Sequence, residues 1–350
     1  MTQKPLDKSV MMEAVDAVEI HGSVTQAAIH LGIPRNTLQN RIARAKQEGV
    51  QPFKVRYEEN KGLEIPILPD EEISADELID RMTDSFQRRK RAKEHRKWIN
   101  VKAKSNDPIC LAFLGDPHVD DNGCDWPTLR RHVEIIKNTE GMHGCSVGDQ
   151  HNNWVGRLAR LYSKQDTSAQ QAWLLVEWLI KAIDPLILIA GNHDMWTGAG
   201  DPVKWMRSPK NIYEDWQAKV RISFPNGTDT KIFAAHDMAG HSMWNQLHGQ
   251  MKAAKFTGDA DLYISGHKHT WALSQIELPS HNRTPWLARA RGYKFMDEYA
   301  TVKGYEEQNY GHAIGVVIDP EAESQVNRMT CFADLEQAAD FLKWKRSKKS

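Results

Sequence analysis

The chain has 350 residues, with 46 basic side chains balanced by 46 acidic ones, 26% charged residues and 40% in the apolar set. This composition is typical of a globular protein and excludes a wholly disordered or collagen-like chain. At about 150 residues per domain, we expect two domains, or one large domain with an appendage.

The sequence lacks the features of membrane, secreted and disulfide-rich proteins. No apolar run reaches the roughly 20 residues of a membrane helix, so we expect no membrane partner. The N-terminal residues lack the apolar stretch of a secretory signal, which favours a cytoplasmic location. The four cysteines show no CxxC spacing, and we expect free thiols in a reducing compartment.

Residues 1–50 carry apolar side chains at helical spacing, punctuated by Gly22, Gly32 and Pro34. The pattern predicts helices at 8–20, 25–31 and 35–47. We therefore expect a small all-α domain at the N-terminus.

The segment from Gly22 to Ile42 resembles the Fis-type helix-turn-helix, whose usual frame is AAxxLGIxRxTLxxR followed by an apolar residue. In this frame Ala27 and Ala28 let two helices approach, while Leu38 and Ile42 pack beneath. The resemblance implies DNA as a partner, and a homodimer is the arrangement in which such units often work. The side chains expected to face the major groove are Arg35, Asn36, Gln39 and Asn40. The alternative is a helical module that binds protein or its own copy.

Residues 51–107 have the composition of a connector. Two prolines and an acidic run at 66–72 predict a loop, and Ser74 with Glu77 predicts the start of a helix. From Arg88 to Lys104 nine lysines and arginines stand against one acid. This basic segment could neutralise DNA phosphates or form a solvated linker helix. At the other end of the chain, residues 321–350 predict a strand or helix and a weaker basic tail.

Residues 108–320 alternate short apolar runs with helical stretches. The runs lie at 109–114, 145–147, 186–190, 232–235 and 262–265, and an amphipathic helix is expected at 169–183. Runs this short, each followed by a polar loop, predict buried strands. Alternating strands and helices predict an α/β layered domain with ligands at the carboxyl ends of the strands.

Five of these strand ends carry side chains suited to metal chemistry. They read Asp116-Pro117-His118, Gly148-Asp149-Gln150-His151-Asn152, Gly191-Asn192-His193-Asp194, Ala235-His236-Asp237 and Gly266-His267-Lys268-His269. This ordered set resembles the calcineurin-like metallophosphoesterase superfamily, with its DxH, GDxx(D/N), GNH(D/E), lone His and GHxH blocks. The resemblance implies a layered fold of β-sheets flanked by helices.

Two nearby divalent ions need a bridging carboxylate and several nitrogen and oxygen ligands. Imidazoles with carboxylates suit transition metals better than calcium, and we expect Mn²⁺ ahead of Fe, Zn or Ni. By the resemblance, one ion would be held by Asp116, His118, Asp149 and His269. The other would be held by Asp149 as the bridge, Asn192, His236 and His267.

The resemblance also implies residues that act on the substrate. His193 would stabilise the phosphoryl charge and protonate the leaving oxygen, and Asp194 would orient its imidazole. Asn152 could position substrate, and His151 could either line the site or fill space. Four tryptophans follow the metal blocks, and they could stack on a nucleobase, although packing against the sheet is the favoured interpretation: Trp154, Trp196, Trp244 and Trp271.

Together these features predict a two-metal phosphoester hydrolase acting on nucleic acid, with a phosphodiesterase or nuclease favoured over a monoesterase. This pairing of domains is expected of a bacterial or phage genome-handling protein. The alternative is a DNA-binding regulator whose phosphoesterase domain acts on a small nucleotide or is inert. A protein phosphatase is disfavoured, because the second block ends in Asn-Asn rather than the Asp-Arg typical of that branch.

Overall fold

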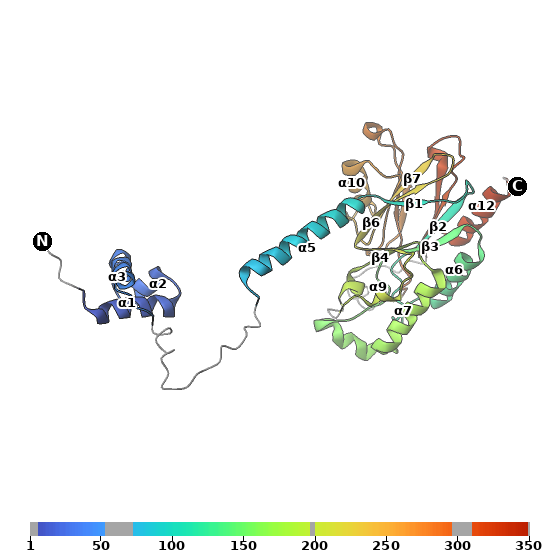
Figure 1. Ribbon diagram of the computed structural model, residues 1–350. Helices are drawn as coiled ribbons and strands as arrows, with labels where there is room; N and C mark the ends of the chain where they lie inside the picture. The colour runs from blue at the N-terminus through green and yellow to red at the C-terminus, as the bar shows by residue number, and fades with distance from the viewer. Residues whose placement is uncertain (1–5, 53–72, 197–199, 296–309, 349–350) are drawn as a thin grey trace. The chain divides into compact units, whose positions relative to one another are not determined.

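The computed structural model describes residues 6–52, 73–196, 200–295 and 310–348. The chain divides into two compact units, Met1–Arg81 and Met82–Ser350, and the boundary falls within helix α5 (Ala75–His95; Figure 1). The connector loop expected at 66–72 lies outside the described residues.

The first unit contains the three expected helices, α1 (Lys8–His21), α2 (Val24–His30) and α3 (Arg35–Gln47). Asp7 and Ser23 cap α1 and α2 by accepting hydrogen bonds from backbone N–H groups. Ala27, Ala28 and Leu38 are buried in one small core, against which Ile42 packs. The packing expected of the helix-turn-helix is thus confirmed.

The second unit is built on two six-stranded sheets. One has the order β12-β11-β2-β3-β4-β5 and the other the order β1-β6-β7-β8-β10-β9. The strands of the first are β2 (Ile109–Leu114), β3 (Met142–Ser146), β4 (Ile187–Ala190), β5 (Ile212–Asp215), β11 (Ala313–Ile318) and β12 (Met329–Phe332). Those of the second are β1 (Ile99–Lys102), β6 (Gln217–Ser223), β7 (Asp229–Ala235), β8 (Leu262–Ser265), β9 (Ala272–Gln275) and β10 (Trp286–Arg289).

The two sheets pack face to face, and helices cover their outer faces (Figure 1). Strand β2 shows why its sequence is apolar throughout: Leu111 and Phe113 point into the core between the sheets, while Ala112 and Leu114 pack toward the helices. The remaining helices are α6 (Trp126–Asn138), α7 (Ala169–Ile183), α8 (Asn192–Met195), α9 (Pro202–Met206), α10 (His248–Thr257), α12 (Leu335–Ser347), and the short η1 (Gly156–Lys164), η2 (Pro279–His281) and η3 (Val326–Arg328). The layered α/β architecture is confirmed.

The connector does not end where the composition suggested. Ile99 to Lys102 form β1, which pairs in parallel with β6, so the last part of the basic segment belongs to a sheet of the second unit. The physical reason is that Ile99 and Val101 alternate with polar residues and half-bury their side chains. The C-terminal residues form β12 and α12 on the first sheet.

All four cysteines are buried free thiols, as expected. None of the helices in the described ranges is both long and apolar enough to cross a membrane.

Candidate metal centre

The site lies where five strands end. Asp116 and His118 follow β2, Asp149 follows β3, and α8 begins directly after β4 with Asn192 and His193. The other ligand candidates follow β7 and β8, which belong to the second sheet: His236, His267 and His269. Because β2, β3 and β4 are parallel, as are β7 and β8, their carboxyl ends bring these loops together.

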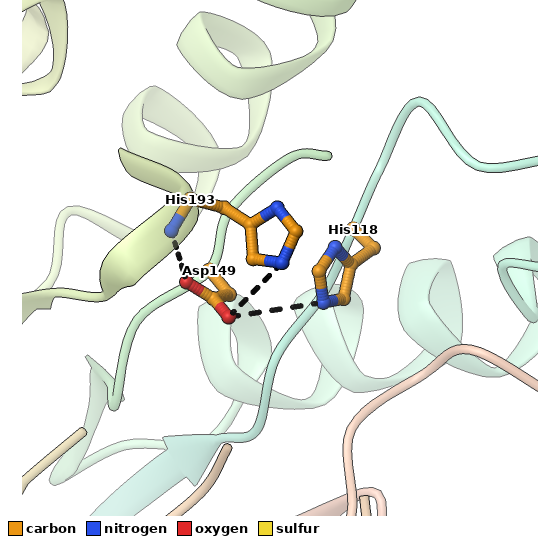
Figure 2. A group of neighbouring side chains, drawn as sticks. All are labelled: His118, Asp149 and His193. Carbon is orange, nitrogen blue, oxygen red and sulfur yellow. Dashed lines mark hydrogen bonds and ion pairs between the residues drawn. The ribbon is translucent and has the colours of Figure 1, made fainter. Parts of the chain in front are cut away.

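Asp149 is the centre of the cluster (Figure 2). Its Oδ2 lies 4.0 Å from His118 Nε2 and 3.9 Å from His193 Nε2. Its Oδ1 accepts a 2.9 Å hydrogen bond from the backbone N–H of His193. His118 and Asp149 are each about 1% exposed, so both side chains are buried, whereas the side chain of His193 is 13% exposed.

His236 brings the second group of ligands to the same carboxylate. His236 Nε2 lies 3.3 Å from Asp149 Oδ2, 2.9 Å from Asn192 Oδ1 and 3.0 Å from His267 Nδ1. On the other side of the ring, Nδ1 lies 2.9 Å from the Val147 carbonyl, which acts as its acceptor. Because Nδ1 donates to this carbonyl, Nε2 is the ring nitrogen that faces Asp149, Asn192 and His267 and that could bind a metal ion once its proton is lost.

Asp116 joins the two groups. Its Oδ2 accepts a 2.6 Å hydrogen bond from the backbone N–H of His267, and its Oδ1 lies 3.6 Å from His236 Nδ1. The remaining expected ligand, His269, has its ring centre 5.2 Å from that of His118. The structure therefore brings together all seven residues expected to bind metal.

The backbone is strained where it presents these ligands. His118, Asp149, His267 and His269 have φ between 41° and 68°, a region that side chains other than glycine rarely adopt. Such residues cost about 1–3 kcal/mol each and cluster at functional sites. Gly191 allows the loops to approach, because a Cβ there would lie 2.1 Å from Asp149 Oδ1.

The buried carboxylates of the cluster favour a positive charge beside them. Burial alone would lower the pKa of His236, but the carboxylates of Asp149 and Asp116 raise it to about 10. Burial would likewise raise the pKa of Asp149, yet His236 and His193 lower it to about 2. Burial lowers the pKa of His118 well below its usual value, which keeps this imidazole neutral and able to act as a ligand.

His193 is oriented by a different group from the one expected. Its Nδ1 contacts the Asn152 carbonyl, which accepts the N–H, and its Nε2 faces Asp149. Asp194 instead accepts three backbone N–H groups, from Asp149 (2.8 Å), Gln150 (3.0 Å) and Gly191 (2.9 Å). The expectation that Asp194 orients the imidazole is therefore wrong: both carboxylate oxygens are used to hold the two ligand loops in register.

Asn152 and His151 are both buried. Asn152 donates its side-chain amide to Asp121 (2.8 Å), and its backbone N–H bonds Asp120 (2.7 Å). The ring of His151 packs 4.1 Å from that of Trp173 on α7, and burial lowers its pKa to about 3. His151 thus has a packing contact, while Asn152 links His193 to a neighbouring acid.

The tryptophans separate into two groups. The rings of Trp196 and Trp154 lie 4.2 Å and 5.4 Å from that of His193. Trp271 packs 5.5 Å from Tyr310, whereas Trp244 is 91% exposed. Two of the four expected rim residues therefore border the imidazole of the site.

Sequence reasoning missed other residues of this region. Asp121 and Lys294 form a 3.0 Å ion pair, and Asn153 donates a 2.6 Å hydrogen bond to the His193 carbonyl. Asp121 could have been found from its place three residues after His118, but Lys294 lies 25 residues beyond the last metal block. Only the fold brings Lys294 to the site.

In the first unit, the side chains expected to contact DNA lie on α3. All four are exposed, and Leu38 between them is fully buried: Arg35, Asn36, Gln39 and Asn40. The helix therefore presents a polar face to solvent while its apolar face fills the core.

Comparison with known protein families identifies the first unit. Residues 10–48 match the helix-turn-helix family described as the Psq domain, which confirms the helix-turn-helix. No curated protein matches the sequence.

The chain is similar to several solved structures. They include a single mutant of Vps29 from Entamoeba histolytica, with 10% identity over 64% of this chain and 97% of that chain and a TM-score of 0.36. The calcineurin-like phosphoesterase YfkN from Bacillus subtilis has 11% identity over 69% of this chain and 97% of that chain, with a TM-score of 0.33. The NAD nucleotidase NadN from Haemophilus influenzae has 11% identity over 64% and 49%, with a TM-score of 0.32. With identities and TM-scores this low, the architecture is assigned from the two sheets of this chain and not from these likenesses.

Proposed function

We propose that the second unit is a two-metal phosphoester hydrolase that acts on nucleic acid, and that the helix-turn-helix delivers it to DNA. The observation that carries the proposal is the convergence of two ligand groups on one carboxylate. Asp149 belongs to two clusters, one with His118 and His193 and the other with His236 and His267, and within each cluster the facing nitrogen and oxygen atoms lie within 4.8 Å of one another.

The donor set fits divalent transition metals. Asp116 Oδ1 and both ring nitrogens of His118 are buried and make no hydrogen bond within the described part of the chain. Buried polar atoms of this kind are rare unless they bind something. One ion would take Asp116, His118, Asp149 and His269, and the other Asp149, Asn192, His236 and His267. We expect Mn²⁺ ahead of Fe, Zn or Ni.

When bound, two such ions supply Lewis acidity toward a phosphoryl oxygen and activate water. Hydrolysis forms a P–O bond to water and breaks the P–O bond to the leaving alcohol, whose oxygen needs a proton. Protonated His193 is placed to supply it: the Asn152 carbonyl holds Nδ1–H, so Nε2–H faces the site. The imidazole is left neutral with its proton on Nδ1.

A direct assay tests the proposal. Full-length protein with Mn²⁺ is tested on single- and double-stranded DNA, a 3′-phosphate oligonucleotide, bis-p-nitrophenyl phosphate and p-nitrophenyl phosphate. We expect hydrolysis, faster with the diesters than with the monoesters, and about two metal ions per chain by elemental analysis. The Asp149→Ala variant should lose both. One ion or none in the wild type would refute the two-metal assignment.

DNA delivery is tested separately. Binding of duplex DNA by the full chain should weaken steeply as salt rises, because lysine and arginine contacts to phosphate release counterions. Replacing Arg35 and Gln39 on α3 by alanine should weaken binding of DNA without changing hydrolysis of p-nitrophenyl esters. Unchanged DNA binding would remove the delivery role and leave the hydrolase proposal standing.

A further inference from the structure

Lys294 is a buried lysine at the edge of the site that the proposed chemistry does not use. It follows β10, and this segment lies against the metal loops: the backbone N–H of Tyr293 donates a 3.2 Å hydrogen bond to the Asp116 carbonyl. A Cβ on Gly292 would lie 2.8 Å from the same carbonyl oxygen. The side chain of Lys294 is only 5% exposed. Lysine is among the residues least often buried, because removing an ammonium from water is costly.

Two separate chains of contacts connect the ammonium to His193. Lys294 Nζ lies 3.0 Å from Asp121 Oδ2, and this oxygen also accepts the side-chain amide of Asn152, whose carbonyl binds the His193 ring. Nζ also lies 5.4 Å from the centre of the Trp154 ring, which itself lies 5.4 Å from the His193 ring. The ammonium is therefore fixed from two directions on the His193 side of the cluster.

Asp121 pairs with Lys294 and also accepts hydrogen bonds from the backbone N–H of Gly123 (2.8 Å) and the amide of Asn152, so this carboxylate is held in place and in turn holds the ammonium. An ammonium has three N–H donors and can bind Asp121 and a phosphate oxygen at the same time.

We propose that Lys294 is a substrate-binding residue that holds a non-bridging oxygen of the scissile phosphate on the His193 side of the site, with Asp121 and Trp154 fixing its position. The inference rests on the proposed function, since it names the residue that recognises the phosphate of that reaction. Nearby cationic contacts to phosphate commonly strengthen both binding and the transition state.

The experiment compares Lys294→Met with Lys294→Arg, Asp121→Asn and a matched control. The control is Lys219→Met, because Lys219 also forms a 2.9 Å ion pair with an aspartate (Asp259) and lies 5.3 Å from a tryptophan ring (Trp98). For each variant we measure KM and kcat on bis-p-nitrophenyl phosphate, inhibition by inorganic phosphate and the manganese content.

We expect Lys294→Met to raise the inhibition constant for phosphate and the KM by about 10-fold or more, with the manganese content unchanged. Lys294→Arg should restore part of the affinity, Asp121→Asn should have the smaller effect, and Lys219→Met should behave as the wild type. Unchanged phosphate inhibition in Lys294→Met would overturn the proposal. An equal loss in Asp121→Asn would overturn it too, since the lysine would then only support Asp121.

The failure of the proposed function is distinguishable from the failure of this inference. If the wild type hydrolyses none of the esters, phosphate binding to the manganese-loaded protein is measured by calorimetry in the wild type and in Lys294→Met. Equal binding refutes the role of Lys294, and weaker binding in the variant supports it without any activity. If Lys294→Met does not fold, the same comparison is made with Lys294→Arg, where unaltered phosphate binding and KM would count against a contact that depends on the ammonium.

Discussion

Asp194 offers the sharpest test of how the site is held together. Its carboxylate is 2% exposed and accepts the backbone N–H groups of Asp149, Gln150 and Gly191. Oδ2 takes two of these donors and Oδ1 takes one. A hydrogen bond to a charged group contributes about 1.5–3 kcal/mol, and a buried donor left without a partner costs about 1–3 kcal/mol.

These numbers predict a graded loss of stability. Asparagine can keep its oxygen on the two donors that share Oδ2 and loses one hydrogen bond, while it also removes a buried charge, so it should cost less than about 3 kcal/mol. Alanine leaves three donors unpaired and should cost about 4–6 kcal/mol, a large part of the roughly 5–15 kcal/mol that stabilises a typical domain. Both variants should also bind less metal, because the loops that carry Asp149 and Asn192 lose their common anchor.

Urea unfolding followed by tryptophan fluorescence measures this cleanly, since all 12 tryptophans lie between residues 98 and 344, in the second unit. The measurement is made at pH 8, because burial and the nearby Asp149 raise the pKa of Asp194 to about 7. Asp340→Asn, at a side chain that is 79% exposed, is the control and should change stability by less than about 0.5 kcal/mol. An Asp194→Ala variant as stable as the wild type would refute the anchoring role, because three backbone N–H groups lose their acceptor in it.

Three further predictions concern other parts of the second unit. Asp149→Ala should lose metal and activity together, whereas His193→Ala should keep its metal and lose about 10²–10⁴-fold in turnover, which elemental analysis and kinetics will separate. Burial lowers the pKa of His132 from 6.5 to about 4. The neutral ring therefore contributes its full stability above pH 6.5, and this contribution is lost as the pH falls toward 4. Between pH 7 and pH 4.5, the free energy of unfolding of His132→Leu should fall by about 2–3 kcal/mol less than that of the wild type. Trp216 has a φ of 65° and is 48% exposed, so Trp216→Gly should relieve backbone strain and leave the urea midpoint equal or higher. A clear drop in the midpoint would show that the indole stabilises the fold.

The sequence predicted the strands and helices that a local pattern of apolar side chains defines. Of the five strands that precede the metal blocks, β2, β4 and β8 are almost entirely apolar because both their faces are buried, and α7 begins and ends at the predicted residues, Ala169 and Ile183. Strand β6 was missed because only alternate residues are buried, so it shows no apolar run. An alternating pattern of this kind marks a strand that is half exposed.

The residues of the site also fall into those that a local sequence pattern predicts and those that it does not. The ligands could be predicted because each follows its own strand within a short block, and parallel strands align those blocks. The roles of Asp194 and Lys294 could not, because they depend on contacts with residues far away in the chain. Asp194 bonds the backbone of residues 44 and 45 positions earlier, and Lys294 pairs with Asp121 across the domain. Backbone acceptors such as the Asn152 carbonyl leave no trace in residue type at all.

The position of His193 shows why its role must be decided by metal content rather than by activity. Its Nε2 lies 3.9 Å from Asp149 Oδ2, close to the 4.0 Å of the ligand candidate His118, so distance alone does not separate a ligand from a proton donor. The difference lies in the protonation state. A ligand needs a lone pair on Nε2, whereas a donor to the leaving oxygen needs a proton there. Because the Asn152 carbonyl fixes a proton on Nδ1, the donor must be the doubly protonated ring, which Asp149 favours and burial opposes. If His193→Ala loses metal as Asp149→Ala does, the lone pair is used and another group must protonate the leaving oxygen.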